Sequence, residues 1–485
     1  MDYYYKNDES TVDQTIWELV SAEADYSIFV DYIKQAGLDS LFTSGKSLTL
    51  IIPSNDAFTD FKEDSVAMEL LLSYHLIETV VNIRNITDSR KIESASGKYL
   101  LFEMHDQNYY IDGVNVSYTS PLCLDGRFYV VNEVLYPKPT IYEYIADNNP
   151  VMKKYIDQFD SVYLDVNEST PIAYDEEGNT IYDSVFSFIN MFDSLYFPVD
   201  QEYRNRGATM ILVDAEDYYP ALDVMADNMQ GFTSHEDIPD EWQLNVLIPH
   251  IINNGFFQNI LNYEDFLIGD MKNIIGDSIS VDYTQIDPNS RTIVSNGVLY
   301  KYLNYSVPDS LYSGEIRLQG ESLLEPIGEG VYSWADGVIV TGTSALPRKA
   351  SALDVADNDT ILQLELGRKY EGSFEMSFKI PDVLPQRYRL VIRSNYRPAG
   401  EYEIYVNNEL IGTVDLFGLR RTGISVTGEL FVPEKGFNFA DFWVENLTEY
   451  GDALITFKFI GSGTAPISQM NGLSLDYISL ISVNE

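Results

Sequence analysis

The sequence predicts a multidomain protein in which two copies of an α+β domain are followed by an all-β sandwich. Three observations support this fold class. The chain has 485 residues, enough for about three domains. Four short segments recur in the same order within the first 305 residues. From about Gly314 the chain changes to short alternating runs separated by Gly and Pro, which is typical of strands.

The composition is strongly acidic. With 31 basic and 75 acidic residues the formal net charge is −44, while 45% of the residues are apolar, enough for large cores. Such a surface repels phosphate backbones and anionic lipid headgroups, so we expect no nucleic-acid partner. Asp354, Asp357 and Asp359 lack the spacing and the Gly of a calcium loop, and we expect a solvated loop there. We expect no metal site and no cofactor, because the four His residues are scattered.

The N-terminal segment and the one cysteine carry no site. Residues 1–10 are polar and Tyr-rich, without the apolar run of a signal peptide or a membrane span. We expect a flexible tether left after removal of a leader, although an intact cytoplasmic protein could also start this way.

Cys123 has apolar neighbours and no partner, so we expect a buried side chain rather than a nucleophile.

The internal repeat defines the first two domains. The matching pairs are "TIWE" (15–18) with "TIYE" (140–143), "LTLIIPSNDAF" (48–58) with "ATMILVDAEDY" (208–218), "LLLSYHLI" (70–77) with "LNVLIPHI" (244–251), and "YVVNEVLYP" (129–137) with "TIVSNGVLYK" (292–301). The third pair aligns His75 with His250. We therefore predict one domain at 11–138 and a second at 139–305.

The second copy contains an insertion near 160–207. Within it, "TPIAYDEEGNTIYDSVF" (170–186) has two β-like runs around a Glu-Gly-Asn turn, which predicts a hairpin.

The remaining sequence predicts a linker at 306–313 and a sandwich or jelly roll at 314–485. The expected strands are "GEIRLQG", "GVIVTGT", "ILQLELG", "GSFEMSFKIP", "YRLVIRS", "YEIYVNNELIGTVDL", "ALITFKFIG" and "LSLDYISLISV". Asn407-Asn408 is expected to form a hairpin turn inside the sixth run.

The segment "IIPSNDAF" (51–58) has an ordinary structural explanation. Pro53 removes a backbone donor and ends the strand. Ser54, Asn55 or Asp56 is expected to cap the helix that follows, and Phe58 to pack beneath it. A catalytic role for Asp56 would need a base or a metal, and the sequence supplies neither nearby.

His75 lies in a helix-like apolar run. We expect a buried neutral imidazole that donates to a backbone carbonyl. An adhesion epitope is the alternative.

The first copy resembles a fasciclin-like domain. The resemblance lies in "TLIIPSNDAF", "SYHLI" and "VVNEVLYP", with the Tyr-His motif of the family carried by Tyr74-His75. It implies a mixed α+β fold that is extracellular, non-enzymatic and adhesive. The second copy departs from the motifs at Val213 and Pro249, and its resemblance depends on segment order and on His250.

The C-terminal part resembles the galactose-binding-like jelly roll of carbohydrate-binding modules. The resemblance lies in residues 388–416 and in "NGLSLDYISLISV" (471–483). It implies that a sugar binds at loops on one edge, with a contribution from the Asn before the last strand, here Asn471. Sugar faces stack on aromatic rings, so turn-like Tyr396, Arg397 and Trp334 complete the predicted glycan site, although each alone is more often structural.

Together the three parts resemble surface lipoproteins of Gram-negative glycan-uptake systems. This implies a non-enzymatic protein of the cell surface, held to the outer membrane through a lipid anchor that precedes this chain. It would capture extracellular polysaccharide or adhere to a surface protein. One alternative is a structural subunit that docks on a membrane transporter complex, which an exposed apolar patch on the insertion would favour. Another is a glycoside hydrolase, which needs two carboxylates in one cleft.

Overall fold

The computed structural model describes residues 10–43, 45–59, 61, 67–165, 167–175, 177–429 and 431–483. Apart from Ser10, the expected N-terminal tether lies outside the described residues. The chain divides into two compact units, one of Met1–Ala215 with His250–Asn304 and one of Glu216–Pro249 with Tyr305–Glu485. No helix in the described ranges is both long and apolar enough to cross a membrane.

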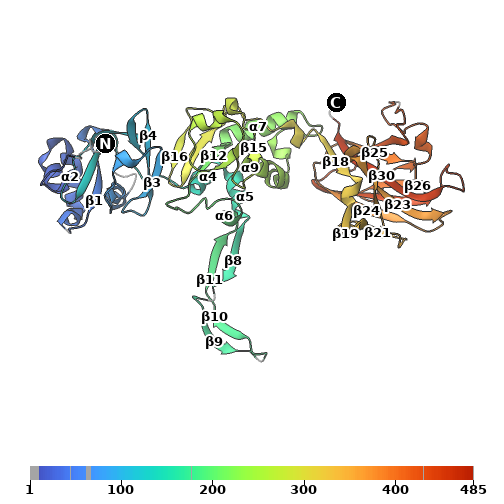
Figure 1. Cartoon of the computed structure of the whole chain (residues 1–485), viewed down its shortest axis with the longest axis horizontal. Helices are drawn as coiled ribbons and strands as arrows, with labels where there is room; N and C mark the ends of the chain where they lie inside the picture. The colour runs from blue at the N-terminus through green and yellow to red at the C-terminus, as the bar shows by residue number, and fades with distance from the viewer. Residues whose placement is uncertain are drawn as a thin grey trace, which may run out of the picture. The chain divides into compact units, whose positions relative to one another are not determined.

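The first copy is a seven-stranded sheet with helices packed against it (Figure 1). The strands are β1 (Leu48–Pro53), β2 (Leu76–Ile77), β3 (Ser89–Glu93), β4 (Tyr99–His105), β5 (Asn108–Ile111), β6 (Val114–Thr119) and β7 (Gly126–Val131), and the helices are α1 (Ile16–Ala22), α2 (Ser27–Gln35) and α3 (Met68–Tyr74). Their order in the sheet is β2-β1-β7-β6-β5-β4-β3, with β1 parallel to β7. Both central strands are buried at every position, because core packs on both of their faces.

The second copy repeats the centre of this sheet. Its elements are α4 (Ile141–Asn148), α5 (Pro150–Asp157), β12 (Ala208–Leu212), α7 (Ala215–Asp227), α8 (Asp240–Trp242), α9 (Ile248–Gly255), β13 (Phe256–Gln258), β14 (Met271–Lys272), β15 (Ser278–Ile279), β16 (Thr292–Val294) and β17 (Gly297–Lys301). β12 is parallel to β17 and antiparallel to β13, as β1 is to β7 and β2.

The helix starts of the two copies make the same contacts. Thr15 and Thr140 each form a capping box with the Glu three residues later. The next amide, of Ile16 or Ile141, donates to the side chain just before the central glycine, namely Asp125 (2.7 Å) or Asn296 (2.8 Å). The first matched pair of segments is therefore also a structural match.

A second shared network lies at the strand centre. Thr49 Oγ1 donates to the Thr79 carbonyl and accepts from the Val81 amide, and Thr209 Oγ1 does the same with Asn259 and Leu261. These matched bonds give the two copies the same register at the second matched pair of segments.

The register corrects the alignment of His75 with His250. Leu50 pairs with Leu76 in the first copy and Met210 pairs with Phe256 in the second, so Gly255 takes the place of His75. His250 lies five positions earlier, inside α9. A π-helical turn at Gln243–Leu247 precedes this helix. The match of the two His residues by sequence is therefore wrong, because the strand register and not the residue type fixes which positions correspond.

The fourth matched pair of segments is also shifted. Gly126 pairs with Leu48, and Gly297 pairs with Ala208. The true match is therefore "DGRFY" (125–129) with "NGVLY" (296–300), and not "VLYP" with "VLYK".

The insertion forms an arm of two successive strand pairs, which Figure 1 shows extending away from the sheet of its own unit. β8 (Asp160–Leu164) pairs with β11 (Phe186–Asn190), and β9 (Thr170–Tyr174) pairs with β10 (Thr180–Asp183), followed by α6 (Phe192–Leu195). The hairpin predicted at 170–186 is confirmed by β9 and β10.

The second unit contains a two-sheet β-sandwich. Its strands are β18 (Glu315–Gln319), β19 (Leu324–Gly328), β20 (Val331–Trp334), β21 (Ile339–Thr341), β22 (Arg348–Ser351), β23 (Thr360–Arg368), β24 (Glu375–Val383), β25 (Tyr388–Asn395), β26 (Glu401–Val406), β27 (Glu409–Asp415), β28 (Phe437–Val444), β29 (Gly451–Gly461) and β30 (Met470–Ser482). One sheet has the order β22-β23-β30-β25-β28 with β18 beside β30, and the other has β21-β24-β29-β26-β27.

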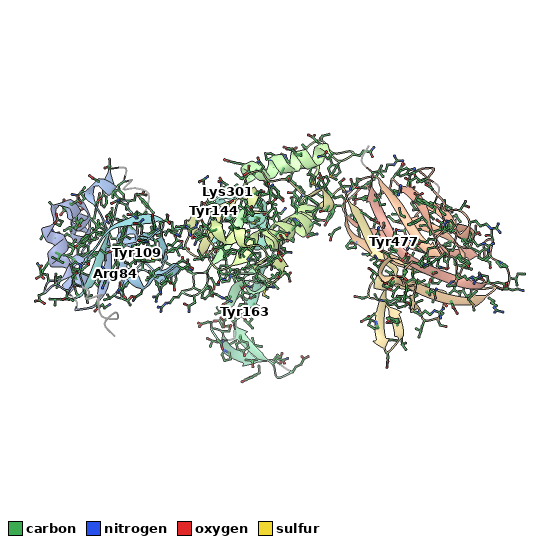
Figure 2. The ribbon with its side chains drawn as sticks, turned by 45° about the horizontal axis from the view of Figure 1, so that its top comes forward. Arg84, Tyr109, Tyr144, Tyr163, Lys301 and Tyr477 are labelled. Carbon is green, nitrogen blue, oxygen red and sulfur yellow. The ribbon has the colours of Figure 1, made fainter. Side chains whose placement is uncertain are left out.

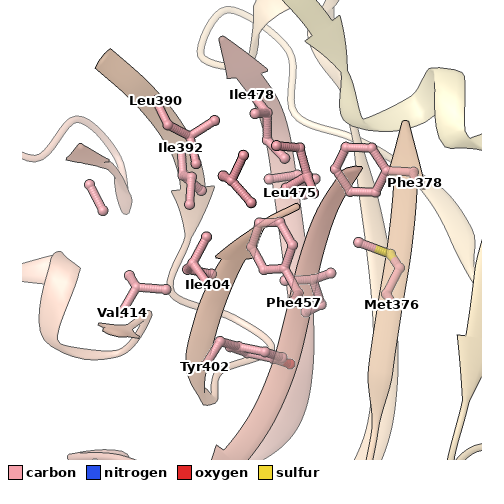
Figure 3. Close-up of a cluster of buried hydrophobic side chains, with 14 of the residues drawn as sticks. Met376, Phe378, Leu390, Ile392, Tyr402, Ile404, Val414, Phe457, Leu475 and Ile478 are labelled. Carbon is pink, nitrogen blue, oxygen red and sulfur yellow. The ribbon is translucent and has the colours of Figure 1, made fainter. Parts of the chain in front are cut away.

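The core of the sandwich lies between these sheets. Figure 3 shows Leu390, Ile392 and Ile478 of one sheet facing Phe378 and Phe457 of the other. Every strand run expected from the sequence contains a strand, whereas β19, β20, β22 and β28 were not predicted. The positive φ angles of Asn407 (47°) and Asn408 (66°) confirm the hairpin turn. In the predicted linker, Val307 and Tyr312 are buried.

Candidate functional site

Three loops at one end of the sandwich meet at Asn471. Its side chain is 1% exposed at the start of β30. Its Oδ1 accepts from the Tyr370 amide (3.0 Å) and the Ser462 hydroxyl (3.2 Å), and its Nδ2 donates to the Ala399 carbonyl (3.3 Å). Asn471 thereby joins the β23–β24, β25–β26 and β29–β30 loops. The geometry gives it a positioning role as well as a place in the wall of a cavity.

A cavity of about 300 Å³ lies beside Asn471. It is lined by Lys369, Tyr370, Glu371, Ser462, Ala465, Pro466, Ile467, Gln469 and Asn471. The Tyr370 ring packs on Phe459 with centroids 5.4 Å apart, and its hydroxyl donates to the Gly342 carbonyl at 2.5 Å. The wall thus combines an aromatic ring with an ammonium, a carboxylate, amides and a hydroxyl, the set that suits a polyhydroxylated ligand.

Sequence analysis missed Tyr370 and Lys369. The available signal was "GRKYEG", an aromatic residue in a polar loop between two strands. Nothing in the neighbouring sequence shows that this loop reaches Asn471, about a hundred residues later in the chain.

Tyr396 and Arg397 do not line this cavity. They belong to the β25–β26 loop, whose Ala399 bonds to Asn471. The Arg397 guanidinium is exposed and lies 4.9 Å from the centre of the Tyr396 ring, and that half-buried ring packs edge-on against Phe417.

Trp334 is not brought to these loops. It lies in β20, where it pairs with Leu324 of β19 and packs, half-buried, against the sandwich core. The sequence placed it in a turn because the β19–β20 hairpin was not predicted. Of the four residues predicted to bind a glycan, Asn471 lines this cavity and Trp334, Tyr396 and Arg397 do not.

The capping role predicted for the turn after Pro53 is wrong. β1 ends at Pro53 as expected, but the turn that follows is a short 3₁₀ segment, Asn55–Phe58, without a side-chain cap. Asn55 Oδ1 instead accepts from the Ile28 amide (3.1 Å), and its Nδ2 donates to the Ala24 carbonyl (2.9 Å). Asn55 therefore holds the start of α2, a helix that precedes it in the chain, while Asp56 is exposed.

Phe58 supports the first copy by packing. Its half-buried ring lies 5.8 Å from that of Tyr32 and 5.3 Å from that of Phe61. We expect Phe58→Ala to lower the free energy of unfolding by about 2 kcal/mol, since a partly buried ring loses part of its packing. Urea titration checks this, with exposed Leu124→Ala as the control. Unchanged unfolding with lost ligand affinity would assign Phe58 to a binding surface instead.

The buried neutral imidazole predicted at His75 is confirmed. Its Nδ1 donates to the Leu71 carbonyl (2.9 Å), and its Nε2 accepts from the Leu135 amide (3.1 Å). Burial lowers the pKa of His75 to about 4. The side chain is 0% exposed, so it cannot serve as an adhesion epitope. His250, in contrast, is half-buried, and its carbonyl accepts from Asn254 Nδ2 (2.8 Å).

Tyr74 pairs with a buried carboxyl group. Its hydroxyl donates to Asp112 at 2.5 Å, and the other oxygen of Asp112 accepts from the Leu101 amide at 2.8 Å. Burial raises the pKa of Asp112 to about 6. The Tyr-His motif therefore occupies the core of the first copy, where both side chains are fully bonded.

Two further cavities lie in the first unit. One, of about 720 Å³, is lined in part by Arg90, Lys91 and Arg204. Lys91 donates to the Arg206 carbonyl at 2.9 Å, and burial lowers the pKa of its ammonium group to about 8.

The other cavity, of about 260 Å³, lies at the base of the arm and is lined in part by Asp160, Asp193 and Asp200. Burial raises the pKa of both Asp193 and Asp200. Asp193 accepts from the Val199 amide (3.2 Å) and from Gln201 Nε2 (3.5 Å), which holds the turn after α6. Within the described ranges no group of three or more acidic, His or Cys side chains is placed to hold a metal ion.

One segment of the chain matches a protein-family model. Residues 24–137 match the family model of the fasciclin domain. No curated protein matches the chain in sequence.

Several solved structures of carbohydrate-binding modules are similar to part of the chain. A family 35 module from Clostridium thermocellum is 13% identical, with 35% of this chain and 98% of that one covered and a TM-score of 0.22. A family 35 module from Paenibacillus barcinonensis is 10% identical, with 35% and 99% covered and a TM-score of 0.21. The C-terminal family 6 module of a laminarinase from Zobellia galactanivorans is 12% identical, with 35% and 99% covered and a TM-score of 0.20.

Proposed function

We propose that this protein binds a glycan, without chemical conversion, at the loop end of its sandwich. The observation that carries the proposal is the cavity beside Asn471, where three loops are fixed to one another and present a Tyr ring among polar groups. Stacking on Tyr370 and hydrogen bonds from Lys369 and Gln469 would hold the sugar, while Asn471 fixes the three loops in place. The sequence resemblance to carbohydrate-binding modules supports the same site.

Affinity electrophoresis of the full chain in neutral and acidic polysaccharides tests this function. For the glycan that retards the chain, we expect Lys369→Ala with Gln469→Ala to weaken binding about tenfold, because both line the cavity. Lys379→Ala, an exposed lysine on β24 that pairs with Asp452, is the matched control. Two results would contradict the proposal. One is a double variant that is retarded as strongly as the wild type, and the other is a wild-type chain that no polysaccharide retards.

Tyr396 and Arg397 would extend the site along the neighbouring loop. We expect Arg397→Ala to weaken binding of the same glycan by about threefold, because its exposed guanidinium stands outside the cavity wall. An effect as large as that of the double variant would place the centre of the site on this loop instead.

We further propose that residues 139–305 form a second fasciclin-like domain and that the protein acts at the cell surface. The matched capping boxes and Thr networks of the two copies support the first point. The resemblance to glycan-uptake lipoproteins supports two further parts of this proposal. A lipid anchor would precede this chain, and the protein would act together with an outer-membrane transporter. Protease accessibility on intact cells and lipid labelling of the precursor test the location.

The glycoside hydrolase alternative has one supporting observation, the carboxylates at the base of the arm. Asp193 and Asp200 line one cavity with raised pKa values, but Asp193 already holds a turn. We expect no release of reducing ends from the glycan that is bound. If the wild type releases reducing ends and both Asp193→Asn and Asp200→Asn abolish this release, the protein is a hydrolase.

A further inference from the structure

The arm, defined as residues 160–190, exposes an unusual number of large apolar side chains. They are Val162, Tyr163, Ile172, Tyr174, Ile181, Val185, Phe186, Phe188 and Ile189. The most exposed are Ile172 (64%), Tyr174 (75%) and Phe188 (80%). Figure 2 shows Tyr163 on the arm, away from the body of its unit. Large apolar side chains gathered on one exposed face mark interaction sites in soluble proteins.

The strand register gathers part of this surface onto one face. Phe188 lies opposite Val162, and Phe186 lies opposite Leu164. Because side chains alternate along a strand, these four share one face of the β8–β11 pair. Among the described residues no third strand pairs with β8 and β11 or with β9 and β10, so the edges of both pairs remain open to a further strand.

The arm is also uniformly acidic. It contains seven Asp and Glu residues and no Lys, Arg or His. Asp165 and Asp175 close turns, since each accepts an amide within its own loop at 3.0 and 2.7 Å. Glu168, Glu177 and Asp183 are exposed beside the apolar residues.

The exposed apolar side chains and the acidic charge of the arm together indicate which kind of partner it binds. A second copy of this chain would bring another surface of the same sign from a molecule with net charge −44, and repulsion opposes that pairing. We propose that the arm docks a different protein, whose receiving surface is an apolar groove bordered by Lys and Arg side chains. The aromatic residues would anchor the contact, and the carboxylates would set partner choice and the rate of association. This inference does not depend on glycan binding by the sandwich.

Site-specific photo-crosslinking in the producing cells tests the proposal. A benzoylphenylalanine is placed at Phe188 or Tyr174 of the full chain, and at Val432 as the control, an 85% exposed apolar residue in the second unit. We expect one protein to be captured from both arm positions and not from the control. Mass spectrometry then identifies the segment of the captured protein that carries the crosslink. We expect this segment to be apolar and flanked by Lys or Arg.

Charge exchange then separates specific docking from adhesion of an apolar surface. Replacing the flanking basic residues of the captured protein by Glu is expected to lower the crosslink yield about tenfold. The combined Glu168→Lys, Glu177→Lys and Asp183→Lys variant is expected to restore it. Capture of another copy of this chain, capture of lipid, an acidic contact segment, an absent crosslink, or no restoration would each overturn the proposal.

Discussion

Gly126→Ala is expected to prevent stable folding of the first copy. A Cβ at this position would lie 1.9 Å from the Leu48 carbonyl oxygen, and the backbone there has a φ of 138°. That oxygen belongs to the central parallel pair β1–β7, so relief requires the two strands to separate. We expect a loss above about 4 kcal/mol, comparable with the whole stability of a small domain.

Gly297→Ala is expected to act in the same way in the second copy. Its Cβ would lie 2.2 Å from the Ala208 carbonyl oxygen, at the matching point of β12 and β17. Near-ultraviolet circular dichroism and amide hydrogen exchange measure both variants. Gly461→Ala, whose Cβ would meet nothing within 4 Å, is the control. Native-like melting of both variants would show that these glycines do not set the spacing of the sheets.

The pH dependence of stability in the first copy is expected to contain two opposed contributions. The native pKa of His75 is about 4 against 6.5 in a free imidazole, so the unfolded chain binds a proton first as the pH falls. Stability is therefore lost between pH 6.5 and 4, by about 3 kcal/mol. The native pKa of Asp112 is about 6 against 3.8, so the native state binds a proton first, and stability is gained between pH 6 and 4 by about 3 kcal/mol.

Substitutions separate these two contributions. We expect Asp112→Asn to lose about 3 kcal/mol more than the wild type between pH 6.5 and 4, because only the His75 contribution remains. His75→Gln is expected to change in the opposite direction, and the double variant to follow the wild type. Urea unfolding at intervals of pH, detected in the first copy, measures the slopes. Parallel slopes in all four proteins would mean that neither group titrates differently on unfolding.

Much of the local structure could be predicted because it depends on near neighbours. The turn at Asn407-Asn408 and the hairpin at 170–186 were predicted and are confirmed, because their partners lie within a few residues of each other. The capping box of Thr15 with Glu18 was not predicted, although its signature is equally local. The buried neutral imidazole of His75 also followed from its apolar helical run, since such a run places the side chain in a core.

The errors concern contacts between distant residues. Ser54, Asn55 or Asp56 was expected to cap the helix that follows, but none does. Asn55 instead holds α2, because the end of β1 lies against that helix. His250 was matched with His75 by residue type, whereas the strand register selects Gly255. Trp334 was placed in a turn because the pairing of β19 with β20 has no strong local signal.

The sequence by itself determined the recurrence of short segments in the first 305 residues, the positions of most strands and the acidic character of the chain, because these depend on residue type and local pattern. The tertiary structure alone decided which loops meet at Asn471, that Tyr370 and not Trp334 stands beside it, and that the apolar residues of the insertion remain exposed. The physical reason is that a cavity and an exposed surface are made by residues far apart in the chain, whose proximity depends on the packing of whole sheets.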